Sequence, residues 1–514
     1  MINDRSLTAT AILSLAFLAL VSGHLLLKSY MPNPAFAGIG LVLVSIIYYY
    51  VLFVRRDTFG FLLVVFVCSY FLYAHNQGGL WNLLTFGMLT IHMVTGQRKE
   101  GFSRPDYVMT ALLGIFILWN VLGWAAKNPI SIVPRMEGVA AFFGFILMFR
   151  LSSNIVITKE RARRLLLIIA FMILYQLLVQ INQRYYILHW NTPLLGGYGE
   201  TGTLLTYGTT NAWGTLVDFE LVAEYAALMV CLLIPLLSSS LTQRELKVGS
   251  NLIVVMIFTC LATILLATNR SATILVALAI TLYYFVLPMR LFSAVDRVAR
   301  QFRLVLVLGI LLPVIGTYIG LHTLENKFSL ISSEKFSVQG VISGKDINRG
   351  GLVDMGLDRL GKESWFIGNG FGVIRSNQWA WFGVDPKDSA PSLNDFHSLY
   401  LSLPELYGWV GAMAFLSMIV VTWFRSMGAA LRNRNRKSYL VVFALGFSMF
   451  WFVFLANEYK ISILRNPSYH MLFWIWLGLT NSVVKTIRFQ NQQEKQERIA
   501  AYLADQEQRK AVSK

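Results

Sequence analysis

The stretch SYLVVFALGFSMFWFVFLA at residues 438–456 contains no charged residue, and the six residues before it, 432–437, are RNRNRK. About 20 consecutive apolar residues in an α-helix are needed to cross the hydrocarbon core of a bilayer. A basic segment beside such a run is typical of the cytoplasmic end of a transmembrane helix. This stretch therefore predicts a membrane-spanning helix whose N-terminal end lies in the cytoplasm.

The same pattern recurs along the whole chain of 514 residues, of which 56% are hydrophobic and only 14% are charged. A soluble domain usually carries about 25% charged residues. Further apolar runs lie at 7–27, 36–54, 58–74, 79–95, 106–124, 136–150, 164–182, 217–237, 250–268, 271–288, 303–321, 404–424 and 467–484. We expect an all-α polytopic membrane protein with about 14 transmembrane helices. This composition excludes soluble enzymes, disordered proteins and secreted disulfide scaffolds.

The net charge of +17 has a topological explanation. With the N-terminus in the cytoplasm, 29 of the 44 Lys and Arg residues fall in the inside loops and the C-terminal tail. Basic residues on that side fix the orientation of the helices and contact anionic membrane lipids. We therefore expect membrane lipids and no nucleic acid among the partners.

Two predicted outward segments are too long to be simple connections, 183–216 and 322–403. The second is rich in Trp and Phe, which disordered segments lack, so we expect a large folded extracytoplasmic loop. Within it, GNGFGVI at 368–374 lacks the lysine of a phosphate-binding loop and indicates a turn-rich connector. The polar tail has Glu494–Arg498 and Asp505–Arg509 at i,i+4 spacing, which predicts a cytoplasmic helix.

Two arginines are candidates for binding an anion. Arg270, in ATNRSATIL at 267–275, lies between two apolar runs on the predicted outer face. A guanidinium in such a poorly hydrated place can bind a phosphate or carboxylate through two hydrogen bonds, and the alternative is an interfacial arginine. Arg349, in DINRGGLVDMGLDRL at 346–360, precedes two glycines and a short predicted helix, although a surface arginine at a helix start is common.

A histidine is the candidate proton acceptor. His397 lies in NDFHSLYLSLPELYGWVGAM at 394–413, about one helical turn outside an apolar run. The ordinary pKa of histidine, about 6.5, suits a general base at neutral pH. Asp395 flanks it, and Glu405 follows further into the run, where it could orient a partner. The alternative is an interfacial histidine bonded to a backbone carbonyl.

The segment from 183 to 237 supplies further candidates. Arg184 precedes the Gly/Thr-rich stretch, and Glu220 and Glu224 share one face of the following helix. Carboxylates inside a membrane can bind sugar hydroxyls, pair with an arginine or carry protons. No cluster of His, Cys and Asp has metal-ligand spacing, so the sequence predicts neither a metal nor a cofactor.

NRSA at the start of a span, the NRGGLVDMGLDRL segment, GNGFG and FHSLYLSLPELYGWVGA, taken in this order on one predicted face, resemble the O-antigen ligase and O-antigen polymerase superfamily. The resemblance covers roughly residues 183–425, including the loop 322–403. We expect N-terminal transmembrane helices in 1–182, C-terminal ones in 426–484 and a cytoplasmic helical tail in 485–514.

The resemblance implies a metal-independent inverting glycosyltransferase of the bacterial inner membrane, active at the periplasmic face. Its donor would be an oligosaccharide on undecaprenyl diphosphate, its acceptor a glycan or a lipid, and other polysaccharide-assembly proteins could be partners. By motif match, Arg270 and Arg349 would engage the donor diphosphate, His397 would activate the acceptor hydroxyl, and Arg184 would be a further basic residue.

Alternatives remain open at the level of sequence. About fourteen spans and an extended loop exceed the usual ligase pattern and favour a polysaccharide polymerase, with a ligase as the alternative. A lipid-linked glycan flippase, another transporter or a non-enzymatic assembly protein would also have many spans. A long folded outer loop that carries the motifs favours chemistry at the membrane surface.

Overall fold

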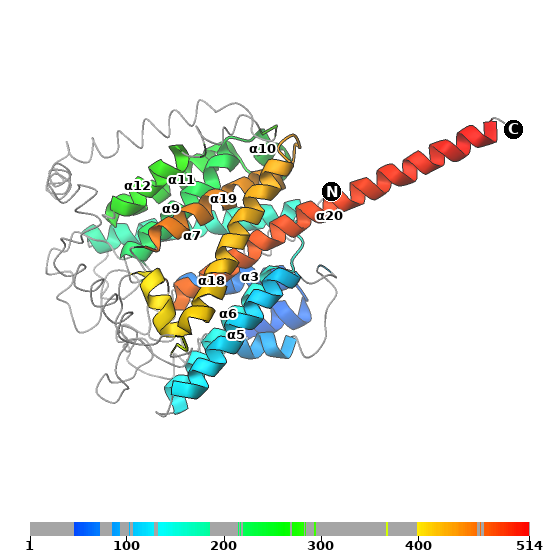
Figure 1. Cartoon of the computed structure of the whole chain (residues 1–514). Helices are drawn as coiled ribbons and strands as arrows, with labels where there is room; N and C mark the ends of the chain where they lie inside the picture. Colours follow the sequence, from blue (N-terminus) through cyan, green and yellow to red (C-terminus); the bar gives the residue numbers. More distant parts are fainter. Residues whose placement is uncertain are drawn as a thin grey trace.

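The computed structural model describes residues 46–71, 85–92, 102, 106–127, 132–185, 214, 216, 219–267, 270–281, 283, 292–293, 366–368, 398–459, 463 and 467–512. Within these ranges the chain forms helices and no strand (Figure 1). The helices are η1 (Tyr50–Val54), α3 (Thr58–Phe71), α5 (Tyr107–Lys127), α6 (Ile132–Ser152), α7 (Lys159–Tyr185), α9 (Phe219–Leu237), α10 (Ser240–Leu246), α11 (Ser250–Leu266), α12 (Arg270–Thr281), α18 (Leu399–Arg432), α19 (Tyr439–Asn457) and α20 (Pro467–Val512).

Five of these helices, α5, α7, α9, α18 and α19, are long and apolar enough to cross a membrane. The pair α10 and α11, bent by 116°, counts as a sixth if it forms one span. Several such helices fit an α-helical, multi-pass membrane protein. The runs at 7–27 and 303–321 lie outside the described residues, so about 14 spans stays a prediction.

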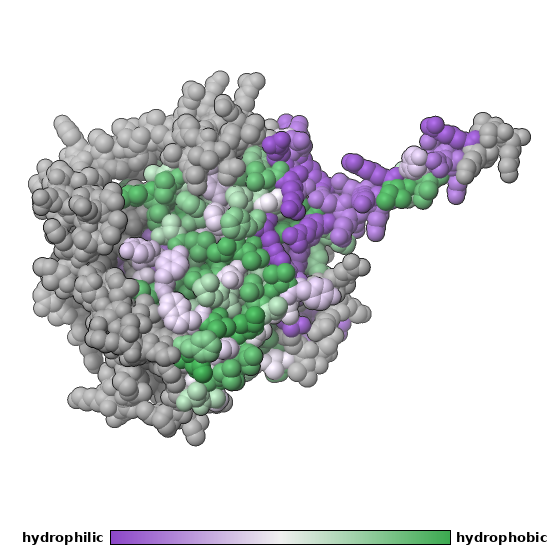
Figure 2. Space-filling view, viewed as in Figure 1, coloured by the Kyte–Doolittle hydropathy of each residue, from purple (hydrophilic) through white to green (hydrophobic). Residues whose placement is uncertain are grey.

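The outer surface of the bundle fits a lipid environment. Leu118 on α5, Leu178 on α7 and Met413 on α18 are each more than half exposed. Figure 2 shows a broad hydrophobic surface over the helices on the side of the bundle that it draws. Apolar surface of this extent on a soluble monomer would be unusual, whereas it is ordinary in contact with lipid.

The central helix is α9, whose apolar part is buried along its whole length. It packs against α11 and α19, while α5 lies along α18 and α6 along α20 (Figure 1). A helix that is apolar on all sides is expected in the middle of a membrane bundle. The position of α9 follows from this, and it makes the two carboxylates near its N-terminus, Glu220 and Glu224, exceptional.

One end of the bundle collects the basic loops. Lys159 pairs with Glu245 at 3.3 Å, and Arg164 pairs with Asp57 at 3.6 Å. Lys485 Nζ donates a hydrogen bond to the Ser153 carbonyl at 3.0 Å. These contacts join loops that the sequence assigns to the inside. We call this end the basic end; its facing the cytoplasm remains a prediction.

A break in α18 changes the span predicted at 404–424. Gly408 has φ 69° and ψ 165°, so the helical path ends there and restarts (Figure 1). The backbone of residues 366–368 lies against this break, where Trp119 Nε1 donates to the Phe366 carbonyl at 2.8 Å. A Cβ on Gly368 would lie 2.1 Å from the Gly408 nitrogen. Glycine is therefore required at 368, at the start of the predicted connector 368–374, whose other residues lie outside the described set.

The C-terminal tail is helical up to Val512, as predicted, and it continues the last helix of the bundle, because α20 runs without interruption (Figure 1). Asp505 and Arg509 form the i,i+4 ion pair that their spacing predicts, at 3.0 Å. Glu494 pairs instead with Arg436, because the turn between α18 and α19 lies beside α20. The spacing of Glu494 and Arg498 favours the helix but does not give the ion pair.

Candidate functional site

Four helix termini meet around Glu224, on the side of the bundle opposite the basic end. Tyr469 Oη, near the start of α20, donates a hydrogen bond to Glu224 Oε1 at 2.8 Å. Asn457 Nδ2, at the end of α19, donates to Glu224 Oε2. The Glu224 side chain is 0% exposed. Two donors on its two oxygens stabilise the carboxylate there and tie α9 to α19 and α20.

The start of α18 is tied to the same place. The backbone nitrogen of Leu399 donates to the Glu458 carbonyl at 2.9 Å, and Tyr400 Oη donates to the carbonyl of Leu455. The Glu458 side chain is itself buried and accepts from the Ile463 nitrogen at 3.2 Å. Ser398, the residue directly after His397, is also buried. The chain therefore enters α18 at the Glu224 cluster, which we define as Glu224, Asn457, Glu458 and Tyr469.

Acidic side chains dominate the buried charge. In the described part of the chain, the buried Asp, Glu, Lys and Arg residues are Glu220, Glu224, Glu405 and Glu458. A buried carboxylate is costly unless hydrogen bonds or a cation compensate it. Such groups can accept hydrogen bonds from sugar hydroxyls or hold an arginine in place.

Two further helix ends belong to this end of the molecule. Gln180 Nε2 on α7 donates to the Thr263 carbonyl of α11 at 3.4 Å, so the C-terminal parts of α7 and α11 are neighbours. Arg184 lies one turn beyond Gln180 in α7. Arg270 is the first residue of α12, which begins shortly after α11 ends. A helix N-terminus carries a partial positive charge that favours an anion.

Gly214, in the Gly/Thr-rich stretch 183–216, packs against α7. Gly214 has φ +62°, and a Cβ there would lie 1.5 Å from the Gln176 amide nitrogen on α7. The positive φ favours glycine, and the short distance shows that the backbone at Gly214 lies directly against the Gln176 side chain. The end of the stretch 183–216 thus packs on α7 about two turns before Arg184.

The sequence-predicted residues divide into two groups. Glu224 and Glu405 are buried, at 0% and 2% exposed, and α7 and α12 carry Arg184 and Arg270 near the same end. The structure describes the helix positions of these two arginines and not their side chains. The remaining candidates lie outside the described residues; they are Arg349, Asp395 and His397.

Sequence reasoning missed Asn457 and Tyr469. Each is a polar residue at the end of an apolar run, which is a weak signal because such residues also occur at lipid interfaces. Across the described ranges, no three His, Cys, Asp or Glu side chains are grouped so that they could hold a metal ion.

No protein-family model matches the chain, and no curated protein matches it.

Proposed function

We propose that the chain is an inner-membrane glycosyltransferase that polymerises an undecaprenyl-diphosphate-linked glycan at the periplasmic face. In this proposal it has about 14 transmembrane helices and a folded outer loop over 322–403. Transfer to a lipid acceptor, which is ligase activity, is the second candidate. The residues that carry the resemblance to the O-antigen ligase and polymerase superfamily motivate both.

One observation supports the proposal most strongly. The helix positions of Arg184 and Arg270 and the first residues after His397 belong to the end of the bundle that contains the Glu224 cluster. The basic loops belong to the opposite end. If the basic end faces the cytoplasm, the candidate site faces outward, where a lipid-linked donor would be used.

The proposed reaction needs no metal. Arg270 and Arg349 would bind the donor diphosphate and neutralise its charge, which makes it a better leaving group. The acceptor hydroxyl oxygen would attack the anomeric carbon as His397 takes the hydroxyl proton. The bond from the anomeric carbon to the diphosphate oxygen would break, and its electron pair would leave with the diphosphate.

The buried carboxylates have a supporting role in this proposal. Glu224 is held by two donors and cannot rotate freely, so its role is to fix the helix ends around the site. Glu405 is buried in the part of α18 between Leu399 and the break at Gly408, where it would orient a partner side chain of the site.

A turnover assay with the purified protein separates the candidates. The protein is reconstituted in liposomes with an undecaprenyl-diphosphate-linked oligosaccharide, and the products are separated by size. A polymerase lengthens the glycan on its carrier, whereas a ligase consumes the donor only when a lipid acceptor is present.

A flippase would move the donor between leaflets and leave its glycosidic bonds intact. Protein-free liposomes are the control for spontaneous hydrolysis. Transport of intact donor without any new glycosidic bond, with or without a lipid acceptor, would overturn the glycosyltransferase proposal.

A further inference from the structure

The basic end contains a cavity of about 400 Å³ between the turn that joins α18 to α19 and the part of α20 that leaves the bundle. Its wall includes four basic side chains, Arg432, Arg436, Lys495 and Arg498, and one acidic side chain, Glu494. Figure 2 shows a hydrophilic surface where α20 emerges, directly beside the hydrophobic surface of the bundle.

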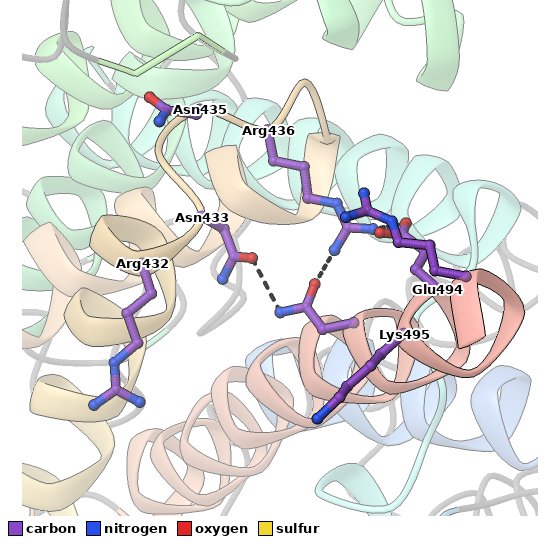
Figure 3. Close-up of a pocket in the computed structure, with 8 residues that line it drawn as sticks. Arg432, Asn433, Asn435, Arg436, Glu494 and Lys495 are labelled. Carbon is purple, nitrogen blue, oxygen red and sulfur yellow. Dashed lines mark hydrogen bonds and ion pairs between the residues drawn. The ribbon is translucent and has the colours of Figure 1, made fainter. Parts of the chain in front are cut away.

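A hydrogen-bonded chain fixes one side of this cavity. Asn491 Nδ2 on α20 donates to Asn433 Oδ1 at 3.0 Å, and Arg436 donates to Asn491 Oδ1 while it pairs with Glu494 (Figure 3). The Asn433 amide also donates to the Ala429 carbonyl at 2.8 Å. The turn and α20 are therefore held at a set distance, so the cavity exists before any ligand binds.

The other cations keep their hydrogen-bond donors available. Arg432, Lys495 and Arg498 form no ion pair with any residue in the described ranges. Figure 3 shows Arg432 and Lys495 on the same side of the Asn433–Asn491 hydrogen bond. A guanidinium and an ammonium from two helices that line one cavity suit a phosphate group, which accepts several charge-assisted hydrogen bonds.

The surroundings add positive charge. Partial desolvation lowers the pKa of the Arg488 guanidinium, and the charges of Arg425 and Arg432 lower it further, with Asp106 opposing them. Crowded like charges are relieved by a bound anion. The cavity also lies between the last residue of one candidate span, Arg432, and the first of the next, Tyr439, the level at which lipid phosphates lie.

We propose that this cavity is a binding site for a phosphate group, supplied by the headgroup of an anionic phospholipid or by a phosphate in solution. The site is separate from the Glu224 cluster and does not depend on the proposed glycosyltransferase activity. Arg432, Lys495 and Arg498 provide the charge, and the Asn433–Asn491–Arg436 chain provides the fixed geometry.

The test uses the detergent-purified full-length protein and two probes, a fluorescent phosphatidylglycerol and inorganic pyrophosphate. Arg432→Gln with Lys495→Gln removes two charges from the cavity. The control variant, Arg434→Gln with Lys437→Gln, also removes two charges. Both of its positions are exposed in the turn after α18, and neither lines the cavity. The four positions are on the surface, so both double variants should keep the melting temperature of the parent.

We expect saturable binding that the cavity pair weakens about tenfold or more, because each lost charge-assisted contact accounts for roughly a factor of ten. The control pair should change the affinity less than about threefold. Saturable binding of phosphatidylglycerol identifies a lipid headgroup as the source, and saturable binding of pyrophosphate identifies a soluble phosphate. Equal weakening by the two pairs, or no saturable binding of either probe, overturns the proposal.

Discussion

Gly408→Ala should destabilise the protein strongly, because two independent costs fall on one residue. The backbone at Gly408, with φ 69° and ψ 165°, lies in a region that other residues almost never adopt, at a cost of about 1–3 kcal/mol. The new Cβ would lie 2.5 Å from the Phe366 carbonyl oxygen and 2.6 Å from the Gly368 nitrogen. Both are backbone atoms, so the segment 366–368 must move.

That movement removes the hydrogen bond from Trp119 Nε1 to Phe366, which adds about 0.5–1.5 kcal/mol. The sum is about 1.5–4.5 kcal/mol. Gly428→Ala is the matched control, since it lies in the same helix and its Cβ would meet no atom within 4 Å. Alanine there should be neutral or stabilising by up to about 1 kcal/mol, because glycine weakens a helix interior.

The assay is thermal unfolding in one detergent, followed with a thiol-reactive dye. The cysteines Cys68, Cys231 and Cys260 are buried and free, so they react only when the bundle opens. We expect Gly408→Ala to melt well below the parent and Gly428→Ala to melt at or above it. Equal melting temperatures for the two variants would refute the described packing of 366–368 on α18.

Three further predictions concern the site and the topology. Glu224→Ala and Tyr469→Phe should each destabilise the protein. Because Tyr469 donates a hydrogen bond to a charged group, a double-mutant cycle should give a coupling energy of about 1.5–3 kcal/mol, and additive effects of the two substitutions would exclude the contact. Arg270→Lys and Arg349→Lys should each lower glycan turnover strongly at matched protein levels, because an ammonium does not replace a bidentate guanidinium. Turnover close to that of the parent would show that the substituted arginine does not bind the donor. A cysteine introduced at Arg434 should resist a membrane-impermeant reagent in intact cells, and its labelling from outside would reverse the topology.

The lengths of the apolar runs predict part of this fold. The apolar run at 438–456 corresponds closely to α19, and the carboxylates at the start of α9 are buried as their position inside an apolar run suggests. Such features depend on local composition and on the length needed to cross a bilayer.

The break in α18 could not be predicted, because LYGWVGAM contains two glycines and only long-range contact decides which one bends. Gly408 faces the backbone of Phe366 and Gly368, which are distant in sequence. The partners of Glu224 were missed for the same reason, since Asn457 and Tyr469 come from other helices. The pairing of Glu494 with Arg436 likewise depends on where the turn after α18 lies.

The central claim is that this chain forms a glycosidic bond and that His397 accepts the proton of the acceptor. The most direct measurement compares glycan formation by the parent, His397→Ala and His397→Gln in liposomes over a range of pH, with Gly428→Ala as the control for substitution as such. Loss of a general base costs about 100- to 10,000-fold, so both histidine variants should form almost no product while they insert and melt like the parent. The parent rate should fall below about pH 6.5, where the histidine ring becomes protonated and cannot act as a base. Substantial glycan formation by His397→Gln, with a flat pH profile in the parent, would contradict the account.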